Sequence, residues 1–358
     1  MKSFTSVSMY PARARENDNP FINILSRGLA ANDVEVRAYI PGWPQPLADA
    51  FHVHWLERIF WGRLASRSTW IQRHLADQIV SAGTKYRAAF KPVVWTAHNL
   101  RPHDGLSDEK KVVFDKLTSG FMPLVTDVVI MDESIAEVVR STYPQLRDAH
   151  FHLIPHPNFT EEFSRHKPFR DARAQYSVPP AAPLLVSIGK IRAYKGLPAL
   201  VRVLRKTSCD FRLVIAGDGD AGEVAQISAE AGNDQRFVMD IRTLEASEVA
   251  GLFGTADAAV FNFTSILNSG SVLSALSAST PVICPNVGAL AGLAKALGEH
   301  WVRTYQAPLT SSVIEREIRS LRISDPLVCD LSASSPLSVG AQHAAIYRGA
   351  MGGASTRV

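Results

Sequence analysis

Short β-rich runs alternate with helical patterns along this chain, and the alternation occurs in two successive series. Such alternation is typical of parallel βαβ units, in which a helix connects each strand to the next strand of the sheet. We therefore expect two parallel sheets, one for each series. The runs are SFTSVSMY, VEVRAYI, FHVHWL, PVVWTAHN, DVVIMD and AHFHLIP in the first series, and LLVSIGK, FRLVIAG, RFVMDI, AAVFNF and PVICP in the second.

The two series are of similar size and predict an α/β protein with two Rossmann-like domains that face a cleft. A chain of 358 residues is long enough for two domains of ordinary size. Ligands of such sheets bind beyond the carboxyl ends of the strands. We expect the first domain over residues 1–165, a Pro- and charge-rich linker over 166–182, the second domain over 183–335, and a C-terminal helix and tail over 336–358, the helix crossing back to the first domain.

The composition supports a folded chain and excludes several classes of protein. Charged residues make up 20% and hydrophobic residues 46%, so the chain can bury a large core. The three cysteines are far apart and form no CxxC pair, as expected of reduced, buried thiols in a cytosolic protein. We find no signal peptide and no apolar run of about 18 residues. A net charge of +4 without a recognition module does not indicate a nucleic-acid partner.

Basic and aromatic residues gather between His52 and Trp95, where seven basic residues stand against two acidic ones. Such a mixture on a helix suits the surface of an anionic membrane. The alternative is an ordinary solvated helix whose aromatic residues enter the core. From the first interpretation we expect a cytoplasmic protein bound peripherally to the inner membrane. The aromatic residues are Trp55, Phe60, Trp61, Trp70 and Tyr86.

The segment SIGKIRAYKG in the second series carries two lysines where a strand ends. Lys190 and Lys195 are five residues apart and can grip two phosphates, while Gly189 lets the backbone approach them. The GxxxxGK[ST] pattern of a P-loop is absent, so this is not a P-loop. The alternative is a solvated basic loop.

Two further features occur where phosphates could bind. Gly217 and Asp218 form part of a tight turn after the run LVIAG. Ser269 or Ser271, on either side of Gly270, can cap the helix that follows Asn268. The first N–H groups of that helix and the positive end of its dipole suit an anion. A purely structural cap is the alternative. Together with the two lysines, these features predict a diphosphate site.

The order of GKIRAYKG, VIAGDGD, RFVMDIRTLEASEVAGLFGTADAAVFNF and NSGSVLSALSASTPVICPNVGAL resembles the donor-binding half of GT-B glycosyltransferases related to family 4. The family pattern is G-R-L-x-x-x-K-G. Lys190 takes the place of its arginine and Lys195 that of its lysine, residues that bind the diphosphate of a nucleotide sugar. The resemblance covers most of residues 184–290. It also implies that the nucleotide lies near Gly189, Gly217, Asp218, Asp240 and Asn268.

The chain departs from this family at two positions. The family has two glutamates eight positions apart before A…G-x-PV, and here those places hold Ile266 and Ser274. With NSGS instead, the chain is similar to xanthan-type β-mannosyltransferases, which are inverting enzymes that use GDP-mannose and a lipid-linked oligosaccharide. The departure weakens the case for a retaining mechanism and leaves a UDP-hexose donor open. The implied partners are a nucleotide sugar and a polyprenyl-diphosphate-linked oligosaccharide or other glycan acceptor.

The resemblance implies a mechanism with no metal and no cofactor. Lys190, Lys195 and the helix after Ser269 would offset the charge that develops on the leaving diphosphate. An inverting reaction also needs a general base within about 3 Å of the acceptor hydroxyl. His98 is similar to the family's active-site histidine, and a hydrogen-bonded turn histidine is its alternative. The carboxylate candidates are Glu57, Asp104 and Asp132 or its neighbour Glu133, among which the sequence does not choose.

Two other functions fit a GT-B chain. A nucleotide-sugar epimerase would need several cleft carboxylates and no basic aromatic surface. A catalytically degenerate partner subunit would agree with the missing glutamates, although the lysine pair and the NSGS turn argue against it. Tight nucleotide binding without turnover would identify the degenerate subunit.

Overall fold

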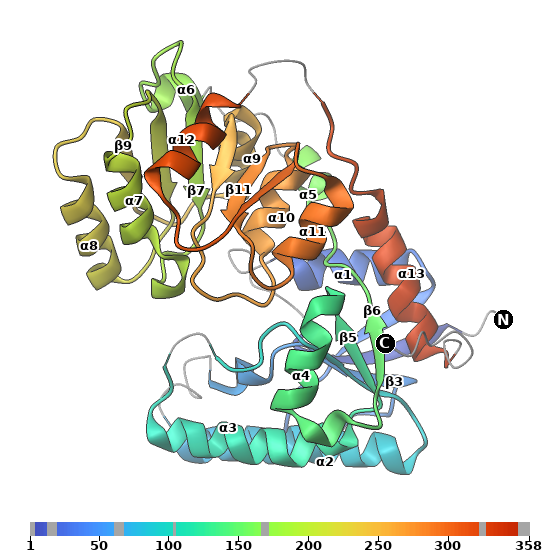
Figure 1. Cartoon of the computed structure of the whole chain (residues 1–358). Coiled ribbons are helices and arrows are strands. Elements are labelled where there is room, and N and C mark those ends of the chain that lie inside the picture. The colour runs from blue at the N-terminus through green and yellow to red at the C-terminus, as the bar shows by residue number, and fades with distance from the viewer. Residues whose placement is uncertain are drawn as a thin grey trace. The chain divides into compact units, whose positions relative to one another are not determined.

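The structure is a computed structural model, and it describes residues 4–12, 20–60, 68–102, 105–165, 172–321 and 327–349. The chain folds into two compact units (Figure 1). The first unit is Met1–Pro157 with Ser332–Val358, and the second is Asn158–Leu331. This division assigns the expected linker at 166–182 wholly to the second unit.

The first unit contains a parallel six-stranded sheet of order β2-β1-β3-β4-β5-β6. Its helices cover the sheet. The chain adds β2 on one side of β1 and then places β3 on the other side, so the switch point of the strand order lies between β1 and β3. The strands are β1 (Thr5–Tyr10), β2 (Val34–Ala38), β3 (Ala50–Val53), β4 (Val93–Thr96), β5 (Asp127–Ile130) and β6 (His150–Leu153), and the α-helices are α1 (Phe21–Ala30), α2 (Thr69–Ala88), α3 (Asp108–Phe121), α4 (Ala136–Thr142) and α13 (Pro336–Tyr347).

The C-terminal helix α13 belongs to the first unit and packs against α1. Two glycines allow this approach: a Cβ on Gly28 would lie 2.0 Å from the carbonyl oxygen of Pro336, and a Cβ on Gly340 would lie 2.3 Å from the backbone of Gly28. Val339 of α13 shares a buried core with Leu25 and Leu29 of α1. The expected return of the last helix to the first domain is confirmed.

The second unit contains a parallel six-stranded sheet of order β12-β11-β10-β7-β8-β9. The two parallel sheets confirm the predicted α/β class. The strands are β7 (Leu184–Ile188), β8 (Arg212–Ala216), β9 (Phe237–Asp240), β10 (Ala258–Val260), β11 (Val282–Pro285) and β12 (Val302–Tyr305), and the α-helices are α5 (Thr160–Ser164), α6 (Ala172–Gln175), α7 (Leu197–Arg205), α8 (Ala221–Ala231), α9 (Ala246–Thr255), α10 (Gly270–Ser277), α11 (Leu290–Leu297) and α12 (Ser311–Arg319).

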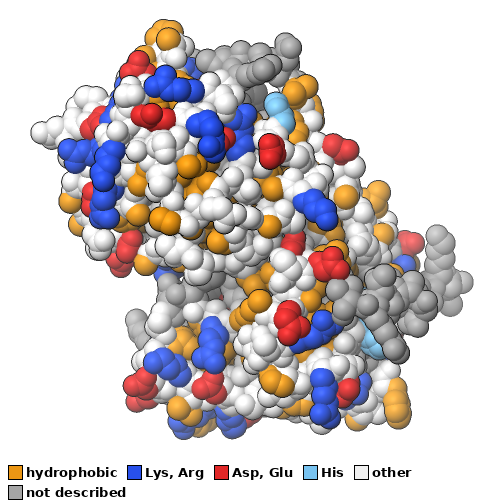
Figure 2. Space-filling view, viewed as in Figure 1, with side chains coloured by type: hydrophobic (Ala, Val, Ile, Leu, Met, Phe, Trp, Pro, Cys, Tyr) orange, Lys and Arg blue, Asp and Glu red, His pale blue; other side chains and the backbone are white. Residues whose placement is uncertain are grey.

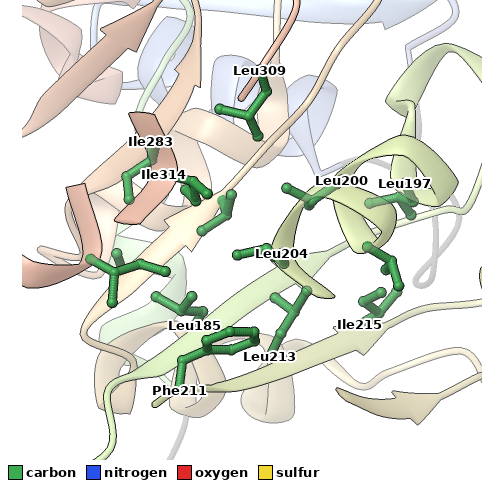
Figure 3. Close-up of a cluster of buried hydrophobic side chains, with 14 of the residues drawn as sticks. Leu185, Leu197, Leu200, Leu204, Phe211, Leu213, Ile215, Ile283, Leu309 and Ile314 are labelled. Atoms are coloured by element: carbon green, nitrogen blue, oxygen red, sulfur yellow. The ribbon is translucent and has the colours of Figure 1, made fainter. Parts of the chain in front are cut away.

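The core of the second unit lies between α7 and the sheet (Figure 3). Leu200 and Leu204 project from one face of α7 toward Leu185 and Leu213 of the central strands. Every residue of β7 is buried, as expected of a strand covered on both faces. The cysteines Cys209, Cys284 and Cys329 are buried free thiols, as the sequence predicts.

The strand order of the second unit fixes where a ligand can bind. The chain builds β7, β8 and β9 outward in one direction and then returns to place β10 on the other side of β7. The switch point therefore lies between the carboxyl ends of β7 and β10, the position at which open parallel sheets bind ligands. The segment GKIRAYKG follows β7, and the NSGS turn comes after β10.

No helix within the described ranges has the length and apolar character needed to cross a membrane. On the face shown in Figure 2, lysine and arginine side chains are interspersed with aspartate and glutamate side chains in each unit. That face therefore presents mixed charge in both units.

Candidate active site

Gly189, Lys195 and Ser271 converge at the switch point of the second unit. Gly189 follows β7 with φ at +116°, in the region that favours glycine. A Cβ on this residue would lie 2.9 Å from Nζ of Lys195 and 3.1 Å from Oγ of Ser271. The bare glycine therefore leaves space beside an ammonium group and a hydroxyl group, both of which can donate hydrogen bonds to an anion.

Lys195 is the last residue of η6, a 3₁₀ helix over Ala193–Lys195, and its side chain is buried. Its ammonium group lies 3.4 Å from the carbonyl oxygen of Ile188. Burial lowers the pKa of Lys195 to about 8, and the charge of Arg192 adds to the effect. A buried cation interacts strongly with an anion because little water screens the two charges.

A hydrogen-bonded frame holds the Lys195 loop against the end of β10. Asn262 donates through Nδ2 to the carbonyl oxygen of Gly196 at 2.9 Å and accepts from the hydroxyl of Tyr305 at 2.8 Å. The amide of Thr264 donates to the carbonyl oxygen of Tyr194 at 2.8 Å. Asn262 and Tyr305 are not among the residues predicted from the sequence, although Asn262, the polar residue near the end of the run AAVFNF, was a signal.

Ser269 is the N-cap of α10, and its hydroxyl accepts from the amide of Val272 at 3.2 Å. The first amides of a helix have no carbonyl one turn earlier to which they can donate, so those of Gly270 and Ser271 are available to another acceptor. The helix dipole favours negative charge at this end. The hydroxyl of Ser269 completes the cap, and that of Ser271 lies toward Gly189.

Three other predicted residues lie around Gly189. Lys190 is exposed directly after it. Gly217 has φ at +137°, and a Cβ there would lie 2.5 Å from the carbonyl oxygen of Gly189, so only glycine lets the two loops meet. Asp218 is exposed, and its carboxylate lies 3.4 Å from the hydroxyl of Thr243.

Asp240 and Asn268 have different surroundings. The carboxylate of Asp240 pairs with Arg242 at 2.8 Å and accepts from the hydroxyl of Tyr176 at 2.7 Å. These bonds satisfy both of its oxygens, so its structural role is to hold the end of β9. Asn268 immediately precedes the cap residue Ser269 and is half-buried.

His98 lies in the first unit, two residues after β4, in a buried aromatic environment. The ring of Trp55 stacks on it at 4.2 Å between centroids, and Phe21 meets it edge-on at 4.6 Å. Its Nε2 lies 3.1 Å from Nδ1 of His54. Burial, with a further contribution from His156, lowers the pKa of His98 well below its ordinary value, so the ring is neutral near pH 7.

Glu57 is bonded to the residue that follows His98, since its carboxylate accepts a hydrogen bond from Nδ2 of Asn99 at 2.8 Å. It belongs to η1, a 3₁₀ helix over Leu56–Phe60 that follows β3. The side chain is buried, and burial raises the pKa of its carboxyl group. A raised carboxyl pKa is a property of carboxylates that act as acids or bases near neutral pH.

The other two predicted carboxylates differ from Glu57. Asp132 is the N-cap of η4 (Glu133–Ile135) and accepts from the amide and hydroxyl of Ser134 at 2.9 and 2.5 Å. These bonds give it a capping role. Asp104 lies outside the described residues.

The first unit also buries a group of histidines whose roles the sequence did not reveal. Both ring nitrogens of His52 form hydrogen bonds. Its Nε2 lies 2.8 Å from Oγ1 of Thr96, and its Nδ1 lies 2.6 Å from the hydroxyl of Tyr347. His52 and His54 stack at 4.1 Å. Within the described ranges, no three His, Cys, Asp or Glu side chains form a group that could hold a metal ion.

Comparison with known proteins agrees with this architecture. Residues 182–304 match the family model described as "Glycosyl transferases group 1". The chain is 25% identical, over 85% of its own length and 80% of the relative's, to GDP-mannose:glycolipid 4-β-D-mannosyltransferase of Xanthomonas campestris pv. campestris.

Two solved structures share the fold over nearly the whole chain. Sucrose-phosphate synthase from Thermosynechococcus elongatus has a TM-score of 0.66 at 14% identity, with 98% of this chain and 100% of that chain covered. Anabaena HepE in complex with UDP has a TM-score of 0.57 at 13% identity, with 96% and 95% covered. This chain is a glycosyltransferase of GT-B fold. The segment that matches the family model contains Gly189, Lys195 and Ser271.

Proposed function

We propose that this glycosyltransferase moves a hexose from a nucleotide sugar to a lipid-linked oligosaccharide in bacterial exopolysaccharide biosynthesis, with inversion and without a metal ion. The observation that carries the proposal is the convergence of Lys195 and Ser271 beside Gly189, where a diphosphate finds an ammonium group and a helix N-terminus. GDP-mannose is the favoured donor, which is also the donor named for the Xanthomonas relative.

The donor half supports the departure of the nucleoside diphosphate. As the bond between the anomeric carbon and the phosphate oxygen breaks, its electron pair passes to the diphosphate. Lys195, Lys190 and the first amides of α10 offset this growing charge. Charge stabilisation of this kind is usually the largest single contribution to catalysis. It also supplies the positive charge that a metal ion provides in other transferases.

The acceptor half must remove a proton from the attacking hydroxyl. Glu57 is the carboxylate best suited to this role, since it is buried, has a raised pKa and is oriented by Asn99. Its proton acceptance lets the hydroxyl oxygen form the new glycosidic bond on the face opposite to the leaving diphosphate. The product then has the inverted anomeric configuration.

Transfer from radiolabelled nucleotide sugars to a polyprenyl-diphosphate oligosaccharide tests this function. We expect product with GDP-mannose, no loss of rate in EDTA, and an inverted linkage by NMR. If product forms only with UDP-hexoses, the donor is a UDP-hexose and not GDP-mannose. Tight nucleotide binding with no product from any donor, over a panel of glycan acceptors, would support the catalytically degenerate subunit instead.

The acceptor's lipid places the enzyme at the cytoplasmic surface of the inner membrane, and α2 supports that part of the proposal. Trp70 is exposed near the start of the helix, and Arg73, Lys85 and Arg87 are exposed along it. Exposed aromatic and basic side chains suit an anionic surface. In a flotation experiment, the enzyme should rise with vesicles that contain anionic lipid and not with neutral vesicles. Equal recovery of the enzyme with both kinds of vesicle would contradict binding to an anionic membrane surface.

A further inference from the structure

The loop between β2 and β3 exposes three large apolar side chains and contains no charged residue. We call residues 39–48, with the sequence YIPGWPQPLA, the Trp43 loop. Trp43 is 71% exposed, Ile40 51% and Leu47 41%. One exposed apolar side chain is ordinary on a protein surface, whereas several close together mark a surface that binds a partner.

The Trp43 loop is closed by its own hydrogen bonds. Gln45 donates through Nε2 to the carbonyl oxygens of Ile40 at 2.9 Å and Trp43 at 3.4 Å. The amide of Trp43 also donates to the carbonyl oxygen of Ile40, at 3.1 Å. Three of the ten residues are prolines, whose rings fix φ. A loop held in this way loses little conformational entropy when it binds, which favours association.

Both ends of the Trp43 loop are bonded to α2. The hydroxyl of Tyr39 donates to the carbonyl oxygen of Gln78 at 2.8 Å. The amide of Ala48 donates to the buried hydroxyl of Tyr86 at 2.9 Å. The loop therefore lies along the side of this helix.

His74 of α2 lies between the loop and a second exposed tryptophan. A Cβ on Gly42 would lie 3.8 Å from Nε2 of His74. The ring of Trp70 stacks on that of His74 at 5.9 Å between centroids, and Trp70 is 73% exposed. Because Trp43 directly follows Gly42, the two exposed tryptophans lie on one surface of the first unit, around His74.

The charge that α2 presents beside the Trp43 loop is positive. Arg73, Lys85 and Arg87 are exposed, and within the described ranges none of them forms an ion pair. Asp77, the acidic residue of α2, is paired with Lys116 of α3 at 2.8 Å. The partner of this surface therefore has to satisfy both exposed apolar side chains and positive charge that no acidic residue balances.

We propose that the Trp43 loop enters the interfacial layer of an anionic lipid bilayer, while the cations of α2 contact the headgroups. The inference rests on the membrane part of the proposed function and deepens it by naming the segment that anchors the enzyme in the lipid. Tryptophan suits this layer, because its ring is apolar and its N–H group can still bond to water or to a headgroup. The loop brings no charged side chain, which would be costly to move into lipid.

A second copy of the chain fits this surface poorly. In a twofold symmetric contact, each copy presents the same patch to the other. Arg73, Lys85 and Arg87 of one copy would then approach the same three cations of its partner, and like charges at an interface disfavour association. An anionic bilayer attracts these cations instead, and each basic side chain near its surface adds to binding.

An environment-sensitive dye at residue 43 tests insertion directly in the whole enzyme. The native thiols are buried, so Trp43→Cys can be labelled selectively with nitrobenzoxadiazole. Phe4→Cys is the matched control, because Phe4 is 64% exposed and precedes β1, at the edge of the sheet opposite to the loop.

With vesicles of phosphatidylcholine and phosphatidylglycerol, the dye at residue 43 should brighten, shift to the blue and be quenched by brominated lipid. The dye at residue 4 should do none of these. An unchanged dye at residue 43 on enzyme that floats with the vesicles would overturn the proposal and leave binding through α2 in place.

Partitioning of substituted enzymes gives a second test. Trp43→Ala should lower the vesicle partition coefficient at least about fivefold, because the apolar area of the ring no longer leaves water. Phe4→Ala should partition like wild type. Equal partitioning of Trp43→Ala and wild type would overturn the proposal, as would a dimer of the wild type that Trp43→Ala converts to monomer in light scattering.

The outcome for wild type separates this inference from the transferase activity. If the wild-type enzyme does not bind these vesicles, the inference and the membrane part of the proposed function are both wrong. Transfer from a nucleotide sugar to a water-soluble glycan acceptor does not depend on a bilayer, so it still tests the transferase activity on its own.

Discussion

The ammonium group of Lys195 lies 2.9 Å from the point that a Cβ on Gly189 would occupy. The hydroxyl of Ser271 lies 3.1 Å from the same point, so a side chain at Gly189 would crowd both the ammonium group and the hydroxyl. Gly189 follows β7 and Ser271 lies in the first turn of α10. The position of the lysine charge depends on residue 189 being a glycine.

Gly189→Ala should weaken nucleoside diphosphate binding by more than about tenfold, because the methyl group would displace Lys195. The left-handed backbone adds a cost of about 1–3 kcal/mol in unfolding free energy. Gly298→Ala is the matched control: its φ is +82°, and no atom lies within 4 Å of its Cβ position. Isothermal titration calorimetry and denaturant unfolding of both variants check this. Equal losses of affinity would show that backbone strain alone is responsible.

The affinity for a nucleoside diphosphate should fall as the pH rises above about 8. Lys195 has its pKa lowered to about 8, and it loses its positive charge above that value. Binding needs the charged form, so Kd should rise by up to about tenfold per pH unit. Titrations between pH 7 and 9 check this. Lys195→Met should abolish the break near pH 8, and a break that persists in this variant would assign it to another group.

Glu57→Gln should lower kcat by about 10²- to 10⁴-fold, the contribution typical of a general base, and should leave the donor KM unchanged. The amide oxygen of glutamine can still accept from Asn99, so the fold is kept. Glu137→Gln on the exposed face of α4 is the control and should be neutral. Steady-state kinetics check this, and an unchanged kcat would exclude Glu57 as the base.

The pH profile gives an independent test of Glu57. A base must be deprotonated, so kcat should increase with pH through the raised pKa of its carboxyl group. The hydrogen bond from Asn99 lowers that pKa, so Asn99→Ala should move the rising limb of the profile to higher pH. If the rising limb does not move, the ionisation that limits kcat belongs to a group other than Glu57.

Gly340→Ala should destabilise the first unit by about 1–3 kcal/mol, since a Cβ there would lie 2.3 Å from the backbone of α1. Gly254→Ala in α9 has open space at its Cβ and should stabilise its helix by up to about 1 kcal/mol. Denaturant unfolding should show these opposite signs. A neutral Gly340→Ala would mean that α13 does not pack closely on α1.

The sequence predicted most of the fold because each strand is short, apolar and separated by helical patterns. It also predicted Gly189, Lys195 and Ser269, since glycines, lysines and caps at strand ends have local signatures. It could not place the boundary between the units, because residues 158–183 are rich in proline and charge yet belong to the second unit. Local composition does not record which core a segment joins.

The candidate site in the first unit was only partly predictable. His98 and Glu57 could be named from their positions after strands, but the bond from His54 and the stacking of Trp55 depend on how β3 and β4 pair. Asn262 and Tyr305 are 43 residues apart and meet only in the folded sheet. Contacts between residues so far apart in the chain produce no regular spacing that could be detected in the sequence.

The binding of GDP and guanosine to three forms of the enzyme tests the central claim most directly. Calorimetry should give a Kd for GDP that is about 10- to 100-fold higher for Lys195→Met than for wild type, which is the loss of affinity expected of one charged hydrogen bond. The Kd for guanosine should change little. Lys206→Met, at the exposed far end of α7, should bind both like wild type. If Lys195→Met weakens GDP and guanosine equally, the diphosphate does not bind beside Gly189, and the assignment of this site is wrong.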